Sequence, residues 1–148
     1  LFIRLMKSRL KGARELKELA LPNAMLLIAD LDYASDYFAA NEVSSISINF
    51  CNPWPKRRHQ KRRLTHPRKL KQYRTFLKDG GLLNFKTDDA DLYQASLDYF
   101  PSCGFDIVRK TSDLKPEEDP SGIITEYEER WRKEGIKIKA IEVVKRAD

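Results

Sequence analysis

Apolar residues follow two different spacings along this chain, and the two spacings alternate. Steps of three and four positions predict a helix over residues 7–20 and another that starts at Thr65-His66-Pro67 and ends at Asp79-Gly80-Gly81. Short apolar or alternating runs predict buried strands between the helices. The predicted strands cover residues 24–29, 45–50, 82–87, 105–110 and 138–144.

Polar residues and prolines mark the ends of these elements. Pro67 suits the first turn of a helix, where no backbone N–H is needed. Asp88 or Asp89 is expected to cap a helix that runs to Phe100. Shorter helices are predicted over residues 33–40 and 125–134, and the polar stretch 111–122 is predicted to be a loop.

This alternation of helices and strands is typical of an α/β fold, with a mostly parallel sheet and helices on both faces. Such sheets bind ligands beyond the carboxyl ends of their strands. Three predicted strands lead into polar residues there, namely Asp30, Asn52 and Asp88. Each also suits a local role, as a helix cap for either aspartate or as a turn residue for Asn52. Their convergence on one edge favours a ligand site.

Composition limits the class of protein. The 148 residues, 41% of them hydrophobic, suit one globular domain. No apolar run approaches the roughly 20 residues of a membrane helix, and no signal peptide opens the chain. Cys51 and Cys103 have no paired spacing, which excludes a disulfide framework and a cysteine-rich zinc site. We therefore expect a cytoplasmic protein with no membrane and no metal partner.

Charge is concentrated in two places. Residues 53–78, here called the basic strip, hold eleven Lys and Arg and no acid, so the rest of a chain of net charge +6 sums to −5. Residues 113–129, the acidic segment, hold seven acids against Lys115. A basic strip alone can be a solvated surface. This one begins with Trp54 between two prolines, which favours aromatic stacking and phosphate binding, and hence a nucleic-acid partner.

Several familiar chemistries lack their motifs. No G-x-G-x-x-G or phosphate-cradling loop occurs, and no serine or cysteine nucleophile has a recognisable elbow. His59 and His66 lie in the basic strip, where no carboxylate could complete a metal site, so both are expected to face RNA or to be structural. The functions that these absences leave open are group transfer that needs little acid–base catalysis, and binding without catalysis.

One long motif opens the basic strip and reads Asn49-Phe50-Cys51-Asn52-Pro53-Trp54-Pro55-Lys56-Arg57-Arg58-His59-Gln60-Lys61-Arg62-Arg63-Leu64-Thr65. Two further blocks follow in order, Phe85-Lys86-Thr87-Asp88 and Thr125-Glu126-Tyr127-Glu128-Glu129. Together they resemble the signature of the tRNA (guanine-N7-)-methyltransferases. That family shows Asp-Pro-Trp-Pro-Lys, a basic His-containing run and Lys-Arg-Arg-Leu.

The resemblance implies a Rossmann-like class I fold, S-adenosylmethionine as cofactor, and methylation of N7 of a guanosine in the tRNA variable loop. It implies cofactor contacts for Asp30 and Asn52, with Asn52 at the position assigned as catalytic. The substrate contacts that it implies are Lys56, Asp88, Thr125, Glu126, Tyr127 and Glu128. We expect the RNA backbone to be bound by Arg57, Arg58, Lys61, Arg62 and Arg63, because guanidinium and ammonium groups hold phosphates.

Two departures from the family are expected to lower activity. Asn52 replaces the family's aspartate and loses its charge. The glycine-rich cofactor motif is absent, and residues 1–6 resemble the strand that follows it but carry no carboxylate. We therefore expect residues 1–148 to form the C-terminal two-thirds or so of one domain that lacks the first βα unit.

The expected chemistry needs little help from the protein. Guanine N7 carries a free lone pair at neutral pH, so positioning and electrostatics suffice. Asp88, Glu126 and Glu128 can accept the guanine's N–H groups and favour the positive charge that develops on the ring. Two alternatives remain. One is a non-catalytic RNA-binding remnant. The other is an amino-group methyltransferase, because Asn-Pro-Trp-Pro loosely resembles the Asn-Pro-Pro-aromatic motif of those enzymes.

Overall fold

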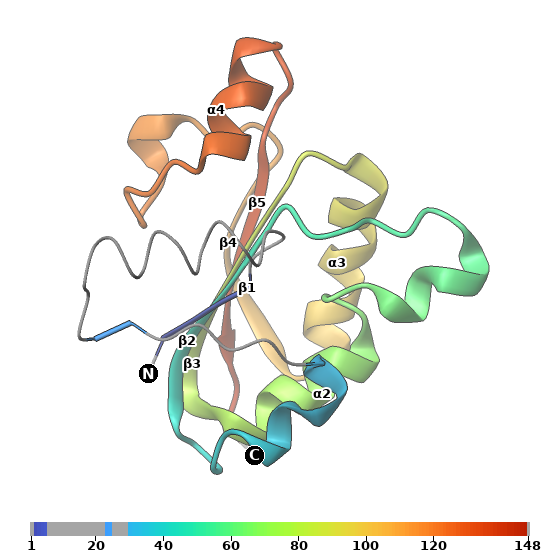
Figure 1. Cartoon of the computed structure of the whole chain (residues 1–148), viewed down its shortest axis with the longest axis vertical. Coiled ribbons are helices and arrows are strands. Elements are labelled where there is room, and N and C mark those ends of the chain that lie inside the picture. Colours follow the sequence, from blue (N-terminus) through green and yellow to red (C-terminus); the bar gives the residue numbers. More distant parts are fainter. Residues whose placement is uncertain (1, 6–22, 25–29, 148) are drawn as a thin grey trace.

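A computed structural model describes residues 2–5, 23–24 and 30–147 (Figure 1). The described strands are β1 (Phe2–Leu5), β2 (Val43–Asn49), β3 (Leu77–Thr87), β4 (Phe105–Thr111) and β5 (Lys139–Lys145). The described α-helices are α2 (Pro67–Phe76), α3 (Ala90–Ser102) and α4 (Glu126–Lys133). Short 3₁₀ helices are η1 (Leu31–Asp36), η2 (Arg57–Arg62) and η3 (Pro116–Glu118).

The strands form one sheet in the order β1-β2-β3-β5-β4. β1, β2 and β3 pair in parallel, whereas β5 runs antiparallel to both β3 and β4. Four of the five strands therefore point the same way, as a mostly parallel sheet requires. Register follows the apolar pattern, because Ile48 lies beside Phe85, and Phe85 lies beside Ile141.

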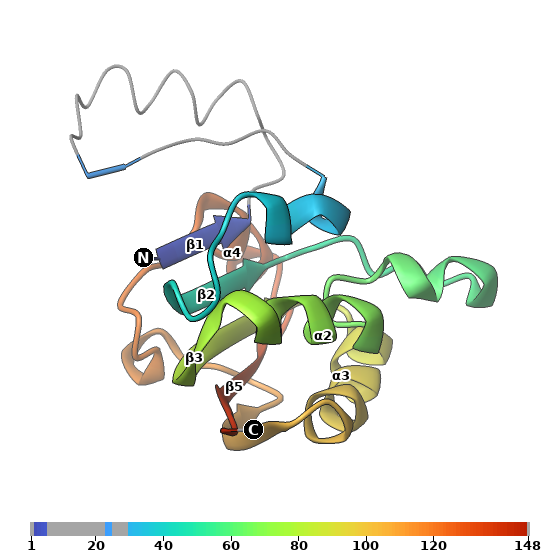
Figure 2. The ribbon, with the colours of Figure 1, turned by 90° about the horizontal axis from the view of Figure 1, so that it is seen from below.

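One face of the sheet carries the main core. Ile46 and Ile48 of β2 and Leu83 and Phe85 of β3 are at most 1% exposed. They belong to the same buried cluster as the apolar side of α2 and α3, which lie together on that face (Figure 2). The alternate positions of the same strands, such as Ser47 and Asn84, point to the opposite face. The sheet therefore has one apolar face and one polar face among the described strands.

Local signals fix the ends of the helices. The Asp89 carboxylate accepts from the Leu92 N–H at 2.6 Å, so of the two predicted caps of α3 it is Asp89 that serves. The Thr125 hydroxyl accepts from the Glu128 N–H at 3.1 Å and begins α4. Pro67 occupies the first position of α2, as predicted. These sequence signals therefore set the helix boundaries.

Several predictions differ from the structure in detail. The helix α2 ends at Phe76, and Asp79, Gly80 and Gly81 lie within β3, because Leu77 is already extended and pairs with Val43. The short helix predicted over residues 33–40 is the 3₁₀ helix η1, six residues long. The helix predicted over residues 7–20, and the strand predicted over 24–29 apart from Ala24, lie outside the described residues. The described α-helices that pack on the sheet, α2 and α3, lie on one face.

Candidate functional site at the carboxyl edge of the sheet

The loop after β2 leaves the sheet through two residues in the left-handed region. Phe50 has φ +51° and Trp54 has φ +44°, which bulky side chains rarely adopt. The Phe50 N–H donates to the Lys86 carbonyl at 2.9 Å, which fixes the loop beside the end of β3. Between them, the Asn52 side-chain oxygen accepts from the Trp54 N–H at 3.2 Å. Asn52 is exposed and has the turn role that its residue type allowed.

Arg63 closes this loop from its far end. Its Nε donates to the Pro53 carbonyl at 2.8 Å, and the residue is only 3% exposed. The sequence predicted that Arg63 binds an RNA phosphate. The structure instead shows its side chain inside the protein, holding the turn that contains Asn52. Direct phosphate contact by Arg63 has no support from this geometry.

The remaining cations of the loop face solvent. Lys56, Arg57, Arg58, Lys61 and Arg62 are all exposed, on η2 or beside it. Arg62 lies 5.1 Å from the Trp54 ring centroid and the His59 ring lies 5.7 Å from it, edge-on. An aromatic ring framed by cations suits an unpaired base and its phosphate. Their role in RNA binding stays a prediction.

His66 has a structural role. Its Nδ1 accepts from the Arg68 N–H at 3.2 Å and caps α2. Burial lowers the pKa of His66, and the positive charges of Arg63 and Arg68 lower it further. The ring is therefore neutral at pH 7, as an acceptor must be.

The second strand end lies beside this loop. After β3, the Thr87 hydroxyl accepts from the Asp89 N–H at 3.1 Å, and the Asp88 carbonyl accepts from Lys139 at 3.0 Å. Asp89 caps α3, so the Asp88 carboxylate is left without the capping role. Asp88 is half-buried at the edge where the resemblance expects a substrate contact.

The helix α4 brings the third block to the same edge. Tyr127 packs on Phe50 at 5.2 Å between ring centroids and on Trp131 at 5.2 Å. Thr125 caps the helix, and Glu126 in the first turn is exposed. The blocks at Asn52, Asp88 and Thr125 therefore meet where β2 and β3 end, although they are far apart in sequence.

Glu128 differs from its neighbours in the block because it is fully buried. Its carboxylate pairs with Lys86 at 3.3 Å and with Arg132 at 2.5 Å, and its side chain is 0% exposed. Lys86 also pairs with Asp119, whose side chain is 2% exposed. Burial raises the pKa of Asp119, but hydrogen bonds from Lys86 and Ser121 outweigh it and hold the pKa below its ordinary value. Substrate contact by Glu128 stays untested, and this geometry gives it no open path.

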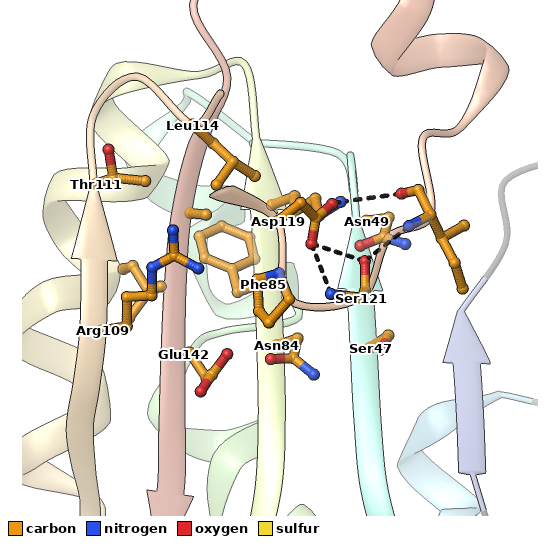
Figure 3. A pocket seen from close by; sticks show the side chains of 15 residues that line it. Ser47, Asn49, Asn84, Phe85, Arg109, Thr111, Leu114, Asp119, Ser121 and Glu142 are labelled. Atoms are coloured by element: carbon orange, nitrogen blue, oxygen red, sulfur yellow. Dashed lines mark hydrogen bonds and ion pairs between the residues drawn. The ribbon is translucent and has the colours of Figure 1, made fainter. Parts of the chain in front are cut away.

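A small pocket lies on the polar face of the sheet (Figure 3). Its volume is about 80 Å³. The floor is formed by strand residues, including Ser47, Asn84 and Glu142, and Asp119 and Ser121 lie over them. The carboxyl edge with its three blocks remains the better match to the predicted site.

Asp30 is the predicted site residue that the structure does not bring to this edge. Its carboxylate accepts from the Asp32 N–H at 2.9 Å and caps η1. Asp32 in turn binds Lys69 of α2 at 2.5 Å, so η1 packs on that helix. A cofactor contact by Asp30 stays a prediction, because the strand predicted to lead into it lies outside the described residues.

Sequence reasoning missed Lys86 and Asp119 as parts of this region. Lys86 lies inside a matched block, and a charged residue within a predicted strand was an available signal. Asp119 lies in a polar loop and gave none. Among the described residues no cluster of His, Cys, Asp and Glu is arranged to hold a metal ion, and no described helix has the length and apolarity to span a membrane.

The chain is similar in sequence to known methyltransferases. A family model described as "Putative methyltransferase" matches residues 6–141. A tRNA (guanine-N(7)-)-methyltransferase of Clostridium perfringens strain SM101 is 47% identical over 136 residues, covering 91% of this chain and 62% of the relative. One from Acetivibrio thermocellus is 52% identical over 99 residues, covering 67% of this chain and 45% of the relative. The chain thus spans about three-fifths of the first of these relatives.

Solved structures support the fold. A SAM-dependent methyltransferase from Aquifex aeolicus superposes with a TM-score of 0.62 at 9% identity, covering 97% of this chain and 67% of that one. An rRNA methylase from Streptococcus thermophilus gives a TM-score of 0.58 at 14% identity, covering 99% and 73%. At such identities the likeness concerns the fold alone, which is the Rossmann-like class I methyltransferase sheet that the sequence predicted.

Proposed function

Because this chain belongs to the methyltransferase family whose model matches residues 6–141, we propose that it acts as a tRNA (guanine-N7-)-methyltransferase, slowed by Asn52. The enzyme would transfer a methyl group from S-adenosylmethionine to N7 of a guanosine in the tRNA variable loop. Relatives of that name at 47% and 52% identity support the proposal. The proposed location is the cytoplasm, where tRNA is modified.

One observation carries the proposal. Three blocks that the family signature would require lie far apart in sequence, and they gather at the carboxyl ends of β2 and β3. Phe50 contacts both others, through the Lys86 carbonyl and through the Tyr127 ring. The exposed cations of η2 continue from the same edge. A guanine at this edge would have its own phosphates within reach of that surface.

The side chains here suit an N7 acceptor. Asp88 and Glu126 would accept hydrogen bonds from the guanine's N1–H and amino group, which orients the ring. Their negative charge also favours the positive charge that the ring gains on methylation. Lys56 would bind the adjoining phosphate. The target base would have to leave its stack to reach this edge, as for other base-modifying enzymes.

The described residues fit S-adenosylmethionine in part. When bound, the cofactor supplies an electrophilic methyl group. By the resemblance, Asp30 and Asn52 would contact it, and the Asn52 amide can hydrogen-bond a neighbour. Asn52 has no charge to favour a sulfonium, and its oxygen is already used by the Trp54 N–H. With Asn52 in this position, we expect weaker stabilisation of the cofactor's sulfonium than the family's aspartate would give.

The same substitution favours one alternative function, a non-catalytic RNA-binding protein. Such a protein would keep the exposed cations and the Trp54 platform and would need no aspartate at position 52. The two functions differ in whether methyl transfer occurs at all.

Methyl transfer to tRNA tests the proposed function. The intact protein, S-adenosylmethionine carrying a labelled methyl group, and unmodified tRNA should yield 7-methylguanosine on nucleoside analysis. Asn52→Asp should raise turnover by about 5- to 150-fold, which corresponds to one charge interaction of about 1–3 kcal/mol. No transfer by either version, together with tight tRNA binding, would favour the non-catalytic alternative.

A further inference from the structure

Lys86 joins three points of one connected segment to the end of β3. Its ammonium donates to the Asp119 carboxylate, to the Ile123 carbonyl at 3.2 Å and to the Glu128 carboxylate at 3.3 Å. An ammonium has three N–H donors, so this lysine is saturated by residues 119–128 alone. Lys86 is 6% exposed, and these contacts are therefore made inside the protein.

The charges in this group balance. Lys86 and Arg132 are positive, and Asp119 and Glu128 are negative. Arg132 binds Glu128 through both Nε, at 3.0 Å, and a terminal nitrogen, at 2.5 Å. Buried charges persist only when they are paired and hydrogen-bonded in this way. The group therefore has one preferred arrangement, and it sets where the loop and α4 sit on the sheet.

Asp119 also folds the loop between the points that Lys86 anchors. Asp119 accepts from the Ser121 N–H at 2.9 Å and from the Ser121 hydroxyl at 2.7 Å, contacts that Figure 3 shows above the strands. The Ile123 carbonyl on Lys86 then directs the chain into Thr125, the cap of α4. The position of Thr125, Glu126 and Tyr127, here called the substrate block, thus depends on these buried contacts.

We propose that Lys86, Asp119 and Glu128 are positioning residues for tRNA binding, which act by holding Thr125, Glu126 and Tyr127 at the carboxyl edge. The inference rests on the proposed function and alters one part of the resemblance, because Glu128 then supports the substrate block from below. Lys86 and Asp119 gain a role that the signature did not give them.

A second buried lysine provides a matched control. Lys145 is 3% exposed and binds the Leu77 carbonyl and Asp79 at 2.9 Å each, at the opposite end of β3. Lys145→Met removes a buried paired ammonium, as Lys86→Met does, but touches neither the loop nor α4. Comparing the two variants therefore separates a general loss of stability from a displacement of the loop and α4.

The test uses the intact protein with Lys86→Met, Asp119→Asn, Glu128→Gln and Lys145→Met. The first three should raise the KM for tRNA about tenfold, with kcat and the KM for S-adenosylmethionine within about twofold, because a uniform binding contribution is lost. Lys145→Met should lower the melting temperature without changing the KM for tRNA. If Lys86→Met does not fold, Asp119→Asn is compared with Lys145→Met in its place.

Two results would overturn the assignment. One is that Lys86→Met loses activity only in proportion to folded protein, as Lys145→Met does. The other is that Glu128→Gln alone raises the KM, which would mean direct contact. The amide hydrogen-exchange rates of residues 119–133 test the inference even if the wild-type protein methylates nothing. Faster exchange in Lys86→Met but not in Lys145→Met supports it, and unchanged exchange rejects it.

Discussion

The basic strip and the acidic segment have opposite charge in the sequence and differ even more in the folded chain. In the loop that opens the basic strip, Lys56, Arg57 and Arg58 point to solvent, and Arg63 alone turns inward. In the acidic segment, Asp119 and Glu128 are buried and paired. Charge counted along a sequence is therefore not charge on a surface. The loop of the first region exposes its charge to solvent, whereas the second region uses part of its own charge to hold its shape.

The largest expected effect is a fall in the free energy of unfolding when the buried carboxylates of the acidic segment lose Lys86. Lys86→Met leaves the buried Asp119 carboxylate without its cation and Glu128 paired with Arg132 alone, and breaking a buried pair costs about 3–5 kcal/mol. Urea unfolding of the variant and the wild type at pH 7 measures the change in the free energy of unfolding. A loss under 1 kcal/mol would mean that water screens these pairs and that the two regions are alike.

The inward-facing arginine should be the exception in the loop that opens the basic strip. Arg63→Ala removes a charged hydrogen bond to the Pro53 carbonyl, and such bonds contribute about 1.5–3 kcal/mol. Arg62→Ala, its exposed neighbour, is the matched control and should cost under about 0.5 kcal/mol. Equal losses for the two variants, measured by urea unfolding, would contradict the distinction.

The pH dependence of stability should separate the two regions again. The pKa of His66 in the folded protein lies below the ordinary value near 6.5, so its cap contributes above that pH and is lost as the pH falls through the lower folded pKa. His66→Asn keeps a capping side chain that does not titrate, and should remove this part of the pH dependence while keeping the cap. Asp119, with its lowered pKa, should act only as the pH falls below about 4. Identical pH profiles for wild type and His66→Asn would exclude the cap.

The smallest effect on stability should come from the largest change of charge. Replacing Arg57, Arg58, Lys61 and Arg62 with Ala should change the free energy of unfolding by under about 0.5 kcal/mol, because these side chains are exposed. The same variant should flatten the salt dependence of tRNA binding, by about one unit of log–log slope for each lost phosphate contact. An unchanged slope would make the strip a solvated surface.

The sequence predicted the order and type of most described elements, because periodicity and caps are local. Thr125 and Pro67 mark helix starts that need no tertiary information. The candidate site was predicted through the long motif and two short blocks, of which Asp88, half-buried, and Glu126, exposed, lie at the edge. Burial was not predictable in the same way. Arg63 and Glu128 look like their neighbours in sequence, and only packing decides that they turn inward.

The bond from Arg63 to the Pro53 carbonyl joins residues ten positions apart and so closes the intervening loop into a ring. The closure uses one side chain at the end of the loop and one backbone carbonyl at its start, and it needs none of the exposed cations between them. Those cations can therefore vary through evolution without cost to the fold. Selection can act on the cations from Lys56 to Arg62 while the ring that presents them is inherited unchanged.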